Sequence, residues 1–453
     1  MSPFRPTRLE IFLTNKCNLR CTYCSSRHLL AGSARTLCLS SLKRAVDIFA
    51  SYGPGPGPRR TICFTGGEPL LEFGLLKAAI LYVRGLREPF DITVNTNATL
   101  LDRRKAEFFI RGDVYLAASL DGGRETHDAH RVFASGGGSV YDVLMRNLRA
   151  LSPASLARVR ASVTVTSRTM PSMIGTISLL QDLGFRFVEL GLDAYERWTP
   201  GGLRMLARTL EAVRRHYSGL LASGDPEKTA RVFTFSLENK QQKAGFYTPM
   251  GDVSLSPDGL FYPSDTLATA AEGGSRFVVG DLENGIDEAK LRAIYRSAAA
   301  AVPPEARAEG AFSPVDRYLY CLAHGRDPRL LLADAAAANA IFSEKIGGLL
   351  EVQRAWRELA KDKDFGDLAH APRQAGARPV RRLALQLRGR APSGLRTSAD
   401  YALYSPARSV SLSLRASRLS GAFGSLEASA IYSSLKARAL GKRLRLAVEA
   451  DSL

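Results

Sequence analysis

Three cysteines within eight residues are the side chains best suited to chemistry in this 453-residue chain. They directly follow LEIFLT (9–14), an apolar stretch that reads as a short buried strand. Cys17, Cys21 and Cys24 have C-x3-C-x2-C spacing, and a loop of this kind can wrap three thiolates around one iron–sulfur cluster. Four cysteines would saturate such a cluster, whereas three leave one iron open for a substrate ligand. The alternative is a structural zinc site of the Cys3His type, completed by His28.

The segments around this loop alternate between strand and helix. Strands are predicted over residues 9–14, 61–67, 91–97, 114–122, 158–166 and 185–193. Helices are predicted over residues 41–52, 73–86, 103–112, 141–151 and 173–184. This alternation implies a parallel sheet with crossover helices, open or partly closed as a barrel. Functional sites in such folds lie at the carboxyl ends of the strands, which is where the cysteines fall.

Composition divides the rest of the chain. We expect a barrel over 1–199, a helical bridge over 200–245, a turn-rich strand region over 246–330, a helical segment over 331–370 and a basic segment over 371–453. The basic segment holds 15 Lys and Arg against four Asp and Glu. Its runs LALQLR, VSLSLR and RLRLAVEA alternate as half-buried strands do. It reads as a β-rich accessory unit with a solvated face, or as a docking surface for an acidic peptide or another anionic partner.

The overall composition excludes several classes of protein. Six cysteines are too few for a disulfide scaffold, and no apolar run reaches the ~18 residues of a membrane helix. The N-terminus lacks the apolar stretch of a signal peptide, so we expect a cytoplasmic protein without a membrane partner. The net charge of +18 comes without a zinc-finger, RNA-recognition or KH signature, so we expect no nucleic-acid partner either.

CNLRCTYC (17–24) resembles the signature of the radical S-adenosylmethionine (SAM) superfamily, including the aromatic Tyr23 before the last cysteine. Later motifs match in order. GGEP (66–69) and NTNA (95–98) resemble two SAM-binding stretches, the second being NTNG in the family. SLDG with ETHDAHR (119–131) resembles the S-x-DG…HD…R stretch of the peptide-modifying branch. The resemblance covers residues 9–195, and zinc ligation predicts none of these later motifs.

The resemblance implies one [4Fe–4S] cluster on the three cysteines, with SAM chelating the open iron. It implies that GGEP holds the SAM amino group, that Asn97 lies near the ribose, and that Ser119 and Arg131 approach the carboxylate. The implied SAM-binding residues are Tyr23, Gly66, Gly67, Glu68, Pro69, Asn97, Ser119 and Arg131. Taken singly, these residues read as turns, helix caps or solvated charges.

The sequence identifies no general acid or base. The polar residues Asp193, Tyr195 and Glu196 follow the last predicted barrel strand, where they would either face a substrate or be ordinary loop residues.

Residues 246–285 resemble the start of a SPASM or Twitch domain, the C-terminal extension of radical SAM enzymes that modify peptides and proteins. The frame MGDVSLSPDGLFYPSD, then VVGDLENG, is present, but Met250 or Gly251 and Ser264 stand where cysteines are expected. The other cysteines are Cys38, Cys321 and Cys63, the last read as core packing in an apolar strand. We therefore expect no auxiliary cluster, which favours redox-neutral chemistry over oxidative crosslinking.

The expected fold is α/β: a partial (β/α)6 radical SAM barrel, a SPASM/Twitch-like region and a basic, β-rich C-terminal segment. The resemblance implies a maturase that uses a 5′-deoxyadenosyl radical to modify a ribosomally synthesised peptide or protein. A flavodoxin or ferredoxin would supply the electron. The alternatives are an enzyme of small-molecule cofactor biosynthesis and a non-catalytic binding partner that retains the fold.

The first predicted strand begins within ten residues of Met1. We therefore expect that leader recognition would need either the basic segment or a separate leader-recognition protein.

Overall fold

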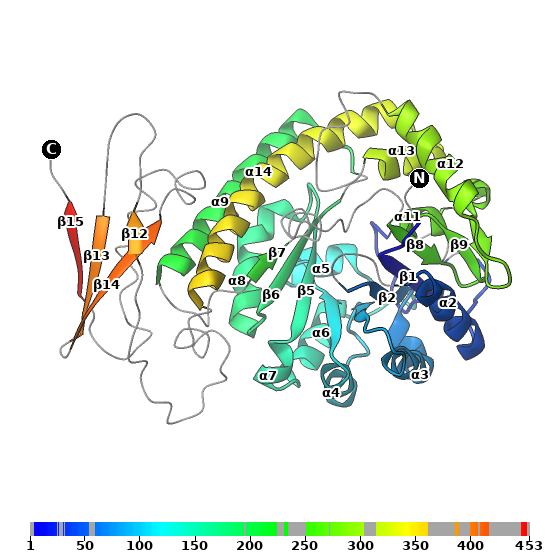
Figure 1. The fold of residues 1–453 in the computed structure, drawn as a ribbon, viewed down its shortest axis with the longest axis horizontal. Helices are drawn as coiled ribbons and strands as arrows, with labels where there is room; N and C mark the ends of the chain where they lie inside the picture. The colour runs from blue at the N-terminus through cyan, green and yellow to red at the C-terminus, as the bar shows by residue number, and fades with distance from the viewer. Residues whose placement is uncertain are drawn as a thin grey trace. The chain divides into compact units, whose positions relative to one another are not determined.

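A computed structural model gives the fold of the chain (Figure 1). It describes residues 4–24, 26, 30, 32–53, 59–193, 196–223, 231–233, 251–270, 272–302, 314–360, 386–388, 399–405, 408–415 and 445–450. The chain divides into two compact units. The first comprises Met1–Leu206 and Thr234–Ser343, and the second comprises Ala207–Phe233 and Glu344–Leu453.

The first unit is built on six parallel strands that neighbour one another in chain order. They are β1 (Arg8–Thr14), β2 (Thr61–Gly66), β3 (Asp91–Thr96), β4 (Val114–Ser119), β5 (Val159–Val165) and β6 (Phe187–Leu192). Between them lie the helices α2 (Leu39–Ser51), α3 (Phe73–Arg84), α4 (Arg103–Arg111), α5 (Arg124–His130), α6 (Val140–Arg149), α7 (Pro153–Leu156) and α8 (Met173–Leu183), and the 3-10 turns η1 (Pro69–Glu72) and η2 (Met170–Ser172). The predicted α/β class and every predicted strand and helix of the barrel are confirmed. The short helices α5 and α7 were not predicted, because neither carries an apolar period.

The two faces of this sheet differ in polarity. Helices such as α2, α3 and α4 lie along the outer side of the row of strands (Figure 1). Outer-face side chains such as Ile62 and Phe64 are fully buried. The other face, here called the inner face, carries Asn95 and Tyr115, which are exposed although their strands are central in the sheet. An exposed side chain on a central strand means that no other described element of the first unit covers that part of the inner face.

Four further strands extend the same sheet from the other side of β1. β8 (Asp252–Leu255) runs parallel to β1, and β9 (Leu260–Tyr262) returns antiparallel through the predicted Pro-Asp-Gly turn, in which Gly259 has φ +85°. The strands β10 (Gly280–Asp281) and β11 (Gly285–Ile286) complete this part of the sheet. Around them lie α11 (Asp265–Ala268), η3 (Glu272–Phe277), α12 (Glu288–Ala301) and α13 (Pro314–Ala323). The SPASM/Twitch-like region therefore continues the barrel sheet instead of forming a sheet of its own.

The remaining elements are α9 (Pro200–Ser223), β7 (Arg231–Phe233), α14 (Pro328–Ala360) and a four-stranded sheet in the order β12-β14-β13-β15. These last strands are β12 (Gln386–Arg388), β13 (Ala399–Ser405), β14 (Arg408–Arg415) and β15 (Arg445–Ala450). The prediction of helix throughout 200–245 was wrong at β7, a short β-branched and aromatic segment. The three strands predicted in the basic segment are confirmed, and β13 was missed. Within the described part of the chain, no helix is long and apolar enough to cross a bilayer.

The difference between the two sheet faces predicts opposite outcomes for two aromatic truncations. Phe64→Ala removes a fully buried ring from the outer face and should lower the free energy of unfolding by about 3–5 kcal/mol. Tyr115→Ala removes a ring that is 46% exposed and should cost less than about 1 kcal/mol. Urea unfolding of both variants checks this. A comparable loss for Tyr115→Ala would show that the inner face is covered.

Candidate active site

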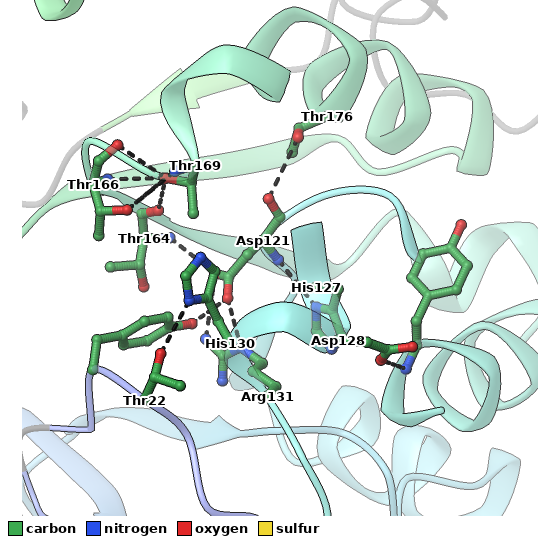
Figure 2. A network of polar contacts seen from close by, with 12 residues as sticks. Thr22, Asp121, His127, Asp128, His130, Arg131, Thr164, Thr166, Thr169 and Thr176 are labelled. Atoms are coloured by element: carbon green, nitrogen blue, oxygen red, sulfur yellow. Dashed lines mark hydrogen bonds and ion pairs between the residues drawn. The ribbon is translucent and has the colours of Figure 1, made fainter. Parts of the chain in front are cut away.

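The cysteine loop after β1 is held in place by the segment that follows α5. The backbone N–H of Arg20 donates to the Val132 carbonyl at 2.8 Å, and that of Thr22 donates to the His130 carbonyl at 2.9 Å. The Thr22 hydroxyl also meets the His130 ring at Nδ1, 3.0 Å away (Figure 2). The first and last of the predicted motifs, more than a hundred residues apart in sequence, therefore form one local structure.

None of the three loop cysteines forms a disulfide, and all three are half-buried. Burial raises the pKa of Cys17 to about 12 and also raises the pKa of Cys21, which the nearby Arg131 guanidinium opposes. Three thiol donors on one loop, beside a buried cation that offsets part of their negative charge, fit the ligand set of an iron–sulfur cluster. Among the residues that the structure describes, no three Cys, His, Asp or Glu side chains converge on a site for a single metal ion. His28, which the zinc alternative requires, lies outside the described residues.

The two glycines of GGEP bring the end of β2 against the start of the cysteine loop. The N–H of Gly67 donates to the Thr14 carbonyl and that of Glu68 to the Lys16 carbonyl, both at 2.8 Å. A Cβ on Gly67 would lie 2.0 Å from the Lys16 oxygen, and Gly66 has φ +126°. Only glycine fits this approach without moving the backbone, so the motif has a structural role whatever it binds.

The Glu68 carboxylate, only 1% exposed, joins β2 to β3. One oxygen accepts from the Thr96 hydroxyl (2.6 Å) and from the Leu70 N–H (3.0 Å), and the other accepts from the Asn97 N–H (2.8 Å). The Asn97 amide donates in turn to Asn18 Oδ1 in the cysteine loop, at 2.9 Å. Glu68 and Asn97 thus position the predicted SAM site through the chain itself, and their direct contacts with SAM stay a prediction.

Two other positions in these motifs are set by the backbone. Pro69 is buried and begins η1, where its fixed φ and missing N–H cost nothing. Ala98 has φ +56°, a left-handed conformation that costs an alanine about 1 kcal/mol. The glycine that the family's NTNG stretch places at this position is therefore explained by the backbone.

Asp121 is the centre of the site's polar network (Figure 2). Its carboxylate is fully buried and accepts from Arg131 Nε at 2.8 Å and Nη2 at 3.4 Å, from the Tyr23 hydroxyl and from the Thr164 N–H at 3.2 Å. Burial alone would raise the pKa of Asp121, but Arg131 holds it below its usual value. The guanidinium carbon also lies 5.3 Å from the centre of the Tyr23 ring. Arg131 is thus fixed beside Cys21, which agrees with its predicted place in the SAM site.

The other residues of the third motif are mostly structural. His127 Nδ1 accepts from the Asp121 N–H at 3.3 Å, and burial lowers the pKa of His127 to about 4. Asp128 accepts from the Tyr141 N–H (2.8 Å) and the Ser139 hydroxyl (2.6 Å) at the start of α6. Ser119, at the end of β4, is half-buried and makes no side-chain hydrogen bond with any described residue, so its hydroxyl is available to a ligand. The sequence did not single out Asp121 or His127, although both lie in the quoted motif.

The loop after β6 contains the three polar residues that the sequence offered either as substrate-facing or as ordinary loop residues. Glu196 accepts from the Ser167 N–H at 2.9 Å and from its hydroxyl, so this carboxylate ties down the loop after β5. The carbonyl of Asp193 accepts from the Trp198 indole at 3.3 Å. Tyr195 lies outside the described residues. The hydrogen bonds of Glu196 agree with the alternative that it is an ordinary loop residue.

The cysteines outside the loop lie on separate elements. Cys38 is exposed at the start of α2, and Cys321 is buried in α13. Cys63 is fully buried as predicted, but it lies on the inner face among polar groups, 3.6 Å from Asn95 Nδ2 and 3.8 Å from Glu10 Oε1.

Of the positions where cysteines were expected, Ser264 is buried and its hydroxyl meets that of Thr266 at 3.0 Å. The carbonyl of Gly251 accepts from the Thr7 N–H at 2.7 Å, and Met250 lies outside the described residues.

Replacing the central carboxylate tests how far the site depends on it. Asp121→Asn leaves the buried Arg131 without its counter-ion and should lower the free energy of unfolding by about 3–5 kcal/mol. Asp142→Asn, a matched control that breaks the exposed pair with Arg124, should cost less than about 1 kcal/mol. Thermal and urea unfolding measure both. Equal losses would show that Arg131 has another anionic partner.

Comparison with known proteins shows what this part of the chain is similar to. Residues 11–165 match the family described as the Radical SAM superfamily. The Fe-coproporphyrin III synthase of Methanosarcina barkeri is 28% identical over 172 residues, which are 38% of this chain and 40% of that protein. The GTP 3′,8-cyclase of Rhodococcus opacus is 28% identical over 307 residues, which are 64% of this chain and 82% of that protein.

The fold also resembles a solved structure, native anSMEcpe with bound AdoMet and Cp18Cys peptide. The TM-score is 0.58 at 18% identity, with 77% of this chain and 99% of that one covered. The family match spans the cysteine loop and the three later motifs that surround it in the fold. Residues 11–165 therefore form a radical SAM superfamily domain.

Proposed function

We propose that the protein is a radical SAM enzyme that modifies one residue of a peptide or protein substrate. The observation that carries this proposal is the Asp121–Arg131 ion pair. It fixes the Arg131 guanidinium next to Cys21 of the cysteine loop. When bound, a [4Fe–4S] cluster supplies the electron that cleaves SAM into methionine and a 5′-deoxyadenosyl radical.

The residues of this chain have separate tasks in that proposal. Cys17, Cys21 and Cys24 hold the cluster. Arg131 attracts the carboxylate of the SAM methionyl group, and the Ser119 hydroxyl, free of described partners, donates to it. Glu68 and Asn97 keep the ends of β2 and β3 in register with the cysteine loop, and so act as positioning residues.

A peptide or protein substrate is supported by the S-x-DG…HD…R stretch and by the open inner face of the sheet. A peptide substrate is also consistent with the similar fold of anSMEcpe, whose solved structure holds AdoMet and a peptide. We further propose a flavodoxin or ferredoxin as reductant and no auxiliary cluster, with a redox-neutral outcome such as epimerisation or rearrangement. A separate protein or the basic segment would recognise a leader sequence.

A small-molecule substrate is the second candidate. The relative from Rhodococcus is named a GTP cyclase and that from Methanosarcina a coproporphyrin synthase, and the first match extends over 64% of this chain. These relatives favour a small molecule, whereas the third motif favours a peptide.

Iron content tests the cluster assignment. Anaerobic reconstitution of the full chain should give about four irons per chain and 5′-deoxyadenosine from SAM. The Cys17/Cys21/Cys24→Ala variant should lose both. Cys38→Ala is the matched control, because this exposed cysteine lies on α2 and should leave both unchanged. If the wild-type chain neither binds iron nor forms 5′-deoxyadenosine, the result would favour the alternative of a non-catalytic binding partner.

Mass spectrometry separates the two substrate classes. Short peptides co-expressed with the wild-type chain should acquire a mass change, or deuterium from solvent, at one residue. The same peptides should show neither change when they are co-expressed with the triple cysteine variant. GTP incubated with the reconstituted chain, SAM and dithionite should stay unchanged. Conversion of GTP, with every peptide unmodified, would favour the second candidate.

A further inference from the structure

A group of acidic side chains lies on the inner face, away from the cysteine loop. Register places Arg8 beside Asp252 and Glu10 beside Ser254, where β1 pairs with β8. Because neighbours in register point to the same side, these four side chains share the inner face. Asp265, the first residue of α11, faces the same group and interacts electrostatically with Glu10 and Arg8. The name acidic pocket is used below for Glu10, Asp252, Ser254 and Asp265.

The acidic pocket contains polar atoms that the chain does not satisfy. Ser254 is fully buried, and its hydroxyl has no hydrogen-bond partner. One carboxylate oxygen of Asp252, Oδ1, is likewise buried without a partner. Both atoms belong to alternate residues of one strand and lie on the same face as Glu10. Unsatisfied buried polar groups are rare in native proteins, and two at one place indicate that something else binds there.

Charge in the acidic pocket is unbalanced. Arg8 opposes the three carboxylates and lies 3.6 Å from Glu10. Burial raises the pKa of Asp252 well above its usual value, and burial with the Glu10 carboxylate raises that of Asp265 to about 7. A cation placed beside Asp252 and Asp265 would therefore favour their charged forms.

The acidic pocket is open to a ligand. As whole residues, Asp265 is exposed and Glu10 and Asp252 are partly exposed, although protein atoms surround the carboxyl groups of Asp252 and Asp265. The described carboxylates do not converge closely enough for a single metal ion. A planar or extended organic cation, with several N–H donors spread over a few ångströms, matches spaced acceptors better than a metal ion does.

We infer that the acidic pocket recognises a guanidinium or ammonium group of the substrate. This inference rests on the proposed function and narrows its substrate to molecules that carry a positive charge. Glu10 lies four residues before Thr14 on β1, about 13 Å from the end of the strand where the cysteine loop begins. A substrate anchored by its cation would therefore present a reacting carbon about one long side chain or a few peptide bonds away.

Calorimetric titration of the full reconstituted chain at pH 8 tests the inference. The probes are N-acetyl-L-arginine methylamide and its neutral isostere N-acetyl-L-citrulline methylamide. The arginine derivative should bind at least ~10-fold more tightly, because shape is matched and only the charge differs. Asp265→Asn and Asp252→Asn should each weaken its binding ~10-fold, whereas Asp142→Asn on α6 should leave it unchanged. Circular dichroism confirms that each variant is folded.

Equal binding of the two probes to the wild-type chain overturns the inference without any variant. Full affinity in both pocket variants overturns it as well. SAM cleavage by the same wild-type preparation separates this inference from the proposed function. Cleavage without preference for the cation contradicts the acidic pocket alone, and preference for the cation without cleavage supports the pocket while contradicting the proposed activity.

Discussion

The buried ion pair between Asp121 and Arg131 is the interaction on which the candidate site depends. Removing two charges from water is costly, and the pair is tolerated because the remaining acceptor positions of Asp121 are filled by Tyr23 and Thr164. The same residue binds Thr176 of α8 through its carbonyl. The cysteine loop, the end of β4, β5 and α8 therefore meet at one residue, Asp121, the first and third of these elements through its carboxylate and α8 through its backbone carbonyl (Figure 2).

Around this ion pair, the residues of the predicted SAM-binding motifs also stabilise the fold. The GGEP glycines permit a backbone contact, and Glu68 and Asn97 are saturated by hydrogen bonds within the chain. These residues are needed to assemble the strand ends before any ligand arrives. Ser119 differs, because its hydroxyl makes no hydrogen bond with any described residue. A motif match alone cannot distinguish a ligand-binding residue from one that positions it.

The sequence predicted the barrel strands and helices because their apolar periods are long and their boundaries carry glycine or proline. It predicted the cysteine loop because the three cysteines lie within eight residues of one another. It missed α5, a polar helix without an apolar period, and the central role of Asp121, which depends on an approach by Arg131 that spacing does not reveal. The acidic pocket could not be predicted either, since Glu10 and Asp252 come together only through the register between β1 and β8, and Asp265 joins them from α11.

The two faces of the sheet place different constraints on sequence change. Burial of Ile62, Phe64 and similar side chains on the outer face stabilises the barrel, so substitutions there are costly. The inner face contributes little apolar burial, as the exposed Asn95 and Tyr115 and the Arg160–Glu189 pair show. Its side chains can therefore change with limited loss of stability. In the proposed function, a substrate bound on this face would be selected by side chains that contribute little to the stability of the fold.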